Sequence, residues 1–127
     1  MERVTVGLAI SRDVLMTSNQ RLHWATKARH TRAIRDMAWI MAKHQRVQLM
    51  PAATLEVVAK WGNRQRRDAE NIHPTVKAAI DGCVSAGLLA DDSSRYLKKV
   101  SYSIADDVHR IEGVACFLEL TFTEVAP

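Results

Sequence analysis

Acidic and basic residues lie close together in the segment Arg66-Arg67-Asp68-Ala69-Glu70-Asn71, and a second acidic pair, Asp91-Asp92, follows after one helix length. Carboxylate oxygens are preferred ligands of hard divalent cations, and arginines beside them can hold an anionic polymer. A cation bound in this way can stabilise the charge that develops when a phosphodiester is hydrolysed. The residue types therefore indicate metal-assisted cleavage of a nucleic-acid backbone.

The candidate metal ligands are the four carboxylates of Asp68, Glu70, Asp91 and Asp92. Side chains two residues apart point the same way in an extended segment, so Asp68 and Glu70 can face one ion. The second pair can join them only if the loop of residues 62–73 runs alongside the helix that follows it. Because Mg²⁺ keeps several of its waters, two or three carboxylates are enough. The alternative is that Asp91-Asp92 is only a solvated turn, as we expect for Asp106-Asp107.

Lys77 lies near the start of the helix that separates the two acidic pairs. Its ammonium group could neutralise the charge of the transition state or position the attacking water. Lys77 and Asp81 are also four residues apart, which is the spacing of a surface ion pair worth a few tenths of a kcal/mol. Both interpretations of Lys77 stay open.

The formal net charge is +4, and the basic residues gather at positions 21–35, 60–67 and 95–99. Acidic residues lie beside the second and third of these groups, and an acidic notch within a basic rim is the electrostatic pattern expected of a nuclease. Contacts to phosphates would make binding dependent on DNA shape and on salt. The residues expected to contact DNA are Arg21, Lys60, Arg64, Arg66, Arg67, Asn71, Lys98 and Lys99.

Other motifs are absent or weak. The sequence has no glycine-rich phosphate loop, so we expect no nucleotide cofactor, and its histidines do not form a zinc motif. We expect His73 to cap the following helix. Trp39 and Trp61 are expected in the core or in an interface, whereas Trp24 lies in a polar segment, and all three could stack on bases.

Hydrophobic periodicity predicts the element order β-α-β-α-β-β. The expected elements are strands at 4–10, 54–61, 96–104 and 116–122, a helix at about 26–47, and a second helix that opens with Pro74 and stops at Gly87. This order fits an α/β (α+β) layer, with helices against a small mixed four-stranded sheet, as one domain spanning residues 1–127. We expect the last two strands to pair as an antiparallel hairpin.

Composition places the chain in the class of globular proteins, since 47% of its residues are hydrophobic and no run is long enough for a membrane helix. No secretory signal is visible. Cys83 and Cys116 lie in apolar runs and are expected to be buried free thiols. These observations predict a cytoplasmic protein with no membrane partner.

The chain resembles the RusA family of Holliday junction resolvases, which is common in phages and prophages. The resemblance begins with the loop Ser18-Asn19-Gln20-Arg21 and the basic helix that carries Arg32 and Arg35. It is strongest over residues 66–92, where Arg-Arg-Asp-Ala-Glu-Asn is followed by Lys-Ala-Ala-Ile-Asp-Gly and Ala-Gly-Leu-Leu-Ala-Asp-Asp. The corresponding family pattern is Asp-x-Asp-Asn, a lysine that opens a helix, and Asp-Asp after a glycine.

This resemblance implies a homodimeric, Mg²⁺-dependent endonuclease that resolves four-way DNA junctions by paired symmetric nicks during recombination and repair. The family's three catalytic aspartates fall on Asp68, Glu70 and Asp92, with Asp91 beside the last, and its essential lysine falls on Lys77. A phage-encoded member would act in the cytoplasm of the bacterial host.

Two departures from the family pattern bear on the site. Glu70 is one methylene longer than the family's aspartate, so Mn²⁺ could replace Mg²⁺ more readily. Relative to the family pattern, this chain also has extra residues before Lys77, and they include Pro74.

The alternatives to a resolvase are a metal-dependent nuclease acting on other branched or flap DNA, a non-catalytic DNA-binding module, and an interaction protein that uses its tryptophans at a dimer surface.

Overall fold

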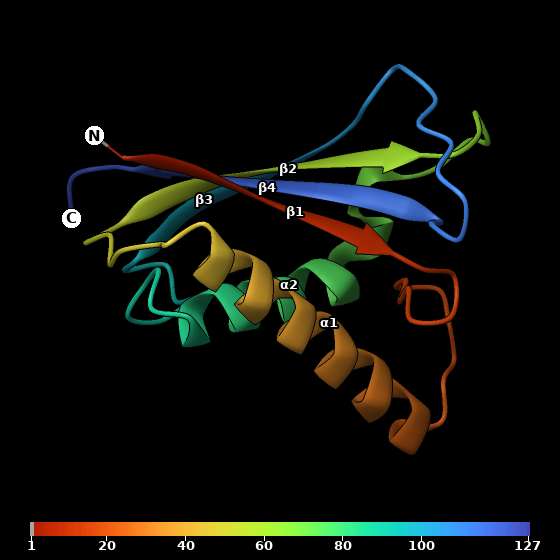
Figure 1. Ribbon diagram of the computed structural model, residues 1–127, viewed down its shortest axis with the longest axis horizontal. Coiled ribbons are helices and arrows are strands. Elements are labelled where there is room, and N and C mark those ends of the chain that lie inside the picture. Colours follow the sequence, from red (N-terminus) through yellow and green to blue (C-terminus); the bar gives the residue numbers. More distant parts are fainter. Residues whose placement is uncertain (1) are drawn as a thin grey trace.

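Apolar residues alternate along the strands and give the sheet one buried face, which the two main helices cover (Figure 1). The structure is a computed structural model and describes residues 2–127. Its elements are β1 (Arg3–Ile10), α1 (Trp24–His44), β2 (Ala53–Trp61), the 3₁₀ helix η1 (Ala69–Ile72), α2 (His73–Ser85), β3 (Leu97–Ile104) and β4 (Cys116–Glu124). The predicted element order and the mixed α+β fold class are confirmed.

The strand order in the sheet is β1-β4-β2-β3. Strand β4 is antiparallel to both β1 and β2, and β3 is parallel to β2. The prediction that the last two strands form a hairpin is therefore wrong. Strand β4 is buried at every second residue from Cys116 to Phe122, which suits the centre of the sheet, whereas Lys98 and Lys99 are exposed on β3, which suits an edge.

The two helices pack closely against each other as well as against the sheet. Helix α1 buries Ile34, Ala38 and Ala42, and α2 crosses it at Gly82. A Cβ atom at Gly82 would lie 2.2 Å from the carbonyl oxygen of Arg35, so only glycine allows this approach. As predicted, α2 begins with a proline in its first turn and is followed by Gly87, whose φ of 101° is left-handed.

The loop between β1 and α1 is fixed to the start of α2 by buried hydrogen bonds. The hydroxyl of Thr75, which is fully buried, accepts from the backbone N of Met16 at 2.9 Å and donates to the carbonyl oxygen of Met16 at 2.7 Å. The backbone N of Ser18 also donates to the carbonyl oxygen of Asn71 at 2.8 Å. These bonds hold the Ser18-Asn19 segment beside η1.

Cys83 and Cys116 are buried free thiols, as predicted. Burial raises the pKa of each thiol to about 12. Among residues 2–127, no helix combines the length and the apolar character that a membrane crossing requires.

Candidate functional site

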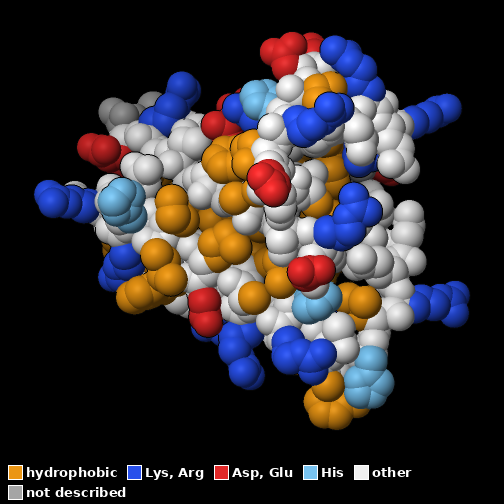
Figure 2. All heavy atoms as spheres, turned by 45° about the vertical axis from the view of Figure 1, so that its right-hand side comes forward, with side chains coloured by type: hydrophobic (Ala, Val, Ile, Leu, Met, Phe, Trp, Pro, Cys, Tyr) orange, Lys and Arg blue, Asp and Glu red, His pale blue; other side chains and the backbone are white. Residues whose placement is uncertain are grey.

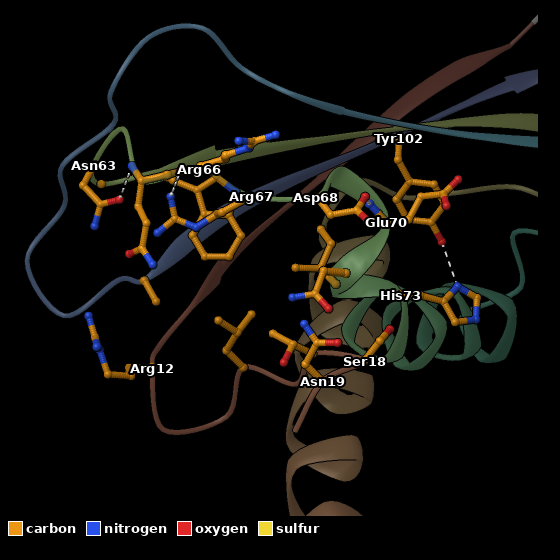
Figure 3. Close-up of a pocket in the computed structure, with 18 of the residues that line it drawn as sticks. Arg12, Ser18, Asn19, Asn63, Arg66, Arg67, Asp68, Glu70, His73 and Tyr102 are labelled. Atoms are coloured by element: carbon orange, nitrogen blue, oxygen red, sulfur yellow. Dashed lines mark hydrogen bonds between the residues drawn. The ribbon is translucent and has the colours of Figure 1, made fainter. Parts of the chain in front are cut away.

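The loop of residues 62–68, η1 and the β1–α1 loop enclose a hollow of about 1070 Å³ at the carboxyl end of β2 (Figure 3). Asp68 and Glu70 both line it, together with Ser18 and Asn19 from the fixed loop. The sequence therefore identified a pair of carboxylates that share one hollow.

The local structure that brings Asp68 and Glu70 together is a helical turn rather than the extended segment we expected. Asp68 is the N-cap residue of η1, and its Oδ1 accepts from the backbone N of Glu70 at 3.1 Å. Both side chains are exposed. None of the ion pairs formed among residues 2–127 involves either carboxylate. The first acidic pair is therefore free to take a cation or another polar ligand.

The second acidic pair does not line this hollow. Asp92 instead forms an ion pair with Lys77 at 2.5 Å, and Asp91 accepts a hydrogen bond from the backbone N of Asp92 at 2.8 Å. Within residues 2–127, no three acidic, histidine or cysteine side chains form a group that could hold a metal ion. The structure thus keeps the two acidic pairs apart, and a metal site built from both stays a prediction.

Lys77 links α2 to the second acidic pair. Its Nζ contacts Asp81 at 2.8 Å, which confirms the expected ion pair between residues four apart. Hydrogen bonds to Asp81 and then to Asp92 raise the pKa of Lys77, and the bond from Lys77 lowers the pKa of Asp92. Lys77 therefore stays charged, and its charge neutralises the acids next to it.

The predicted DNA contacts divide into those at the hollow and those away from it. The residues that line the hollow beside Asp68 and Glu70 are Arg66, Arg67 and Asn71, so these three lie next to the first acidic pair, as predicted. Arg64 lies at a smaller neighbouring depression, and Arg21 lies at another beside the β1–α1 loop. Lys60 on β2 forms an ion pair with Glu119 on β4 at 2.9 Å, and neither Lys60 nor the exposed pair Lys98-Lys99 lines the hollow.

Arg67 is held in place by the aromatic ring of Trp61. The Arg67 guanidinium carbon lies 3.9 Å from the centre of that ring, and its Nη1 donates to the carbonyl oxygen of Gln65 at 3.1 Å. Partial burial lowers the pKa of Arg67. Trp61 is only 8% exposed, which confirms its expected place in the core, and it forms a rigid support for an arginine at the rim.

Several residues of this hollow could not be predicted from the sequence. His73 does not cap α2, because Ile72 occupies the cap position; its Nδ1 instead lies 3.0 Å from the hydroxyl of Tyr102 on β3. Tyr102 lies beside Glu70 in Figure 3, and burial, followed by the charge of Glu70, raises the pKa of its hydroxyl. Arg12 and Arg110 add two cations to the lining. Because these residues come from distant parts of the chain, no local motif could reveal them.

No family model matches this chain, and no curated protein matches it.

Proposed function

We propose that this chain is a Mg²⁺-dependent endonuclease that cuts branched DNA, with the four-way junction as its main substrate. The observation that carries the proposal is the pairing of Asp68 with Glu70 in one hollow whose lining also holds Arg12, Arg66 and Arg67. Carboxylates can bind a hard cation there, and the arginines can bind the phosphates of the substrate. The order of charged residues along the chain adds support through its resemblance to RusA resolvases.

The donor set of the hollow fits a hard cation. Asp68 and Glu70 form no ion pair within the described residues, and the oxygen-bearing side chains of Ser18 and Asn19 line the same hollow. Two carboxylates are enough for Mg²⁺, which keeps most of its waters, and Mn²⁺ can take the same ligands. When bound, such an ion would polarise the scissile phosphate and lower the pKa of a water.

The remaining polar residues of the hollow have roles that follow from their charge. Arg66 is exposed and free to move onto a phosphate, whereas Arg67 is fixed on Trp61 and can only receive one. Lys77 and Asp92 would contribute if DNA binding separated their ion pair. The ammonium group could then face the departing oxygen, and Asp92 could complete the carboxylate set. We further propose a homodimer, because paired nicks in opposed strands require two sites related by two-fold symmetry.

The test is incubation of the purified protein with a synthetic immobile four-way junction, in Mg²⁺ and in a chelator. We expect paired nicks in Mg²⁺ only, and we expect Asp68→Asn and Glu70→Gln each to abolish cleavage while junction binding is retained. The matched controls are Asp107→Asn and Glu112→Gln, which change exposed acids outside the hollow and should cleave normally.

Three outcomes would contradict parts of the proposal. Cleavage in the chelator would exclude a metal-dependent enzyme. Junction binding with no cleavage in Mg²⁺ or Mn²⁺ would favour a non-catalytic DNA-binding module. If flaps, forks or single strands are cut faster than the four-way junction in a parallel panel, the nuclease activity is supported but the four-way junction is not its main substrate.

A further inference from the structure

Helix α1 carries the whole net charge of the chain. It contains five Lys and Arg residues and one acidic residue, Asp36, so its formal charge equals the +4 of the complete sequence. The rest of the chain is therefore neutral in sum. This helix can therefore attract a polyanion, and none of the eight predicted DNA contacts lies on it.

The exposed face of α1 also holds two tryptophans that the core does not use. Trp24 is 78% exposed, and Trp39 is 42% exposed, so Trp39 does not lie in the core. Both line a groove of about 850 Å³ that also includes Lys27, Arg32, Arg35 and Asp36. The two tryptophans are fifteen residues apart, which corresponds to about 22 Å along a helix. Hydrophobic side chains lie among Lys and Arg side chains on the surface that Figure 2 shows.

A small depression lies between this groove and the hollow that holds Asp68 and Glu70, and it shares lining residues with both. Lys27 lines both the groove and a small depression beside the β1–α1 loop, which also contains Arg21. Thr17 and Ser18 line that depression and the hollow as well. Three neighbouring depressions therefore follow one another from the carboxylates, past Arg21 and Lys27, to the tryptophans of α1, and this series is the path considered as a binding surface.

We propose that this path binds an unpaired DNA strand, with Trp24 and Trp39 stacking on bases and Lys27, Arg32 and Arg35 contacting phosphates. Flat aromatic rings at intervals along a basic groove are the features by which proteins bind single strands without reading their sequence. A second copy of the chain fits less well, because two α1 faces of charge +4 would repel each other. The inference deepens the proposed function by adding single-stranded segments to its substrate, and its test does not require cleavage.

The test is the affinity of the protein for a labelled oligothymidylate, measured by fluorescence anisotropy at low salt in a chelator, so that no cleavage can occur. We expect Trp24→Ala and Trp39→Ala each to weaken binding by roughly 5- to 150-fold. Trp24→Phe and Trp39→Phe should restore most of the affinity, because phenylalanine still stacks. The matched controls are Ile40→Ala and Leu49→Ala, which remove exposed apolar side chains outside the groove and should leave binding unchanged.

Unchanged oligothymidylate affinity in both alanine variants, with the native circular dichroism spectrum retained, would overturn the inference. Sedimentation of the same samples tests the other occupant. If the wild type is a dimer and the alanine variants are monomers of unchanged affinity, the groove is a self-association surface and the inference fails. If the alanine variants lose oligothymidylate affinity and the wild type never cuts a junction, strand binding along this path is supported and only the proposed nuclease activity is refuted.

Discussion

Replacing Gly82 tests the close contact between α1 and α2. In Gly82→Ala, the new Cβ would lie 2.2 Å from the carbonyl oxygen of Arg35 and 2.8 Å from the Cβ of Ala38. Neither atom can turn aside, because one is backbone and the other is a methyl group fixed to it. The helices must therefore separate, and overpacking of this kind costs roughly 1–3 kcal/mol.

The helix preference of alanine over glycine opposes this cost by about 1 kcal/mol. Because the closest contact is with backbone, we place the packing cost at the upper end of its range, which leaves a net loss of about 2 kcal/mol in the free energy of unfolding. Urea denaturation of wild type and variant measures this difference. The matched control is Gly62→Ala, whose Cβ would meet its nearest atom, the carbonyl oxygen of His109, at an ordinary 3.8 Å. A Gly82→Ala variant as stable as the wild type would refute the close approach of α1 and α2.

Three further predictions concern charge. The bond from Lys77 holds the pKa of Asp92 below its usual range, so the pair stabilises the fold above the ordinary aspartate pKa and loses this effect as pH falls through the lowered value. Lys77→Met should remove this acid dependence and cost no more than about 1 kcal/mol in the free energy of unfolding at neutral pH, because the pair is substantially exposed. Denaturation at several pH values measures both effects. Asp92→Asn should keep junction binding and lose cleavage, and normal nicking in Mg²⁺ would contradict the proposed ligand role. Junction affinity should fall steeply with salt, and Arg66→Gln should reduce the slope of log affinity against log salt by about 1, whereas a flat salt dependence in the wild type would exclude phosphate contacts.

The strands and helices could be predicted because each buries a face with its own period. The alternation of Cys116, Leu118, Leu120 and Phe122 predicted β4 as a strand. The spacing of Ile34, Met37, Ala38 and Met41 predicted the inner face of α1, where the structure fully buries Ile34 and Ala38 and adds Ala42. The sheet order could not be predicted in the same way. Alternation gives a strand its faces but not its neighbours, and the expected hairpin relied on proximity in sequence alone. The observed order puts β4 and β2 at the centre, and it depends on contacts between strands that are far apart in the sequence.

Some residues of the candidate site could be predicted from a local segment, and others could not. Asp68, Glu70 and Arg66 could be found because their charges lie together within one short segment. Thr75 and Tyr102 could not, since one acts through a buried bond to Met16 and the other through a contact with His73 from a different strand. Long-range contacts of this kind are set by packing, so no local pattern of charge or periodicity encodes them.

Asp92 pairs with Lys77 and does not line the hollow of Asp68 and Glu70. Carboxylates brought together without a cation repel one another, and each would be expected to lose part of its charge. Asp92 avoids this by pairing with Lys77, which Asp81 also holds, while Asp68 bonds to the backbone at the start of η1. The stable arrangement of the protein alone therefore spreads its acids among its own donors. A cation and a phosphate would supply new partners for the carboxylates and for the lysine, so the proposed joining of Asp92 to Asp68 and Glu70 requires both ligands.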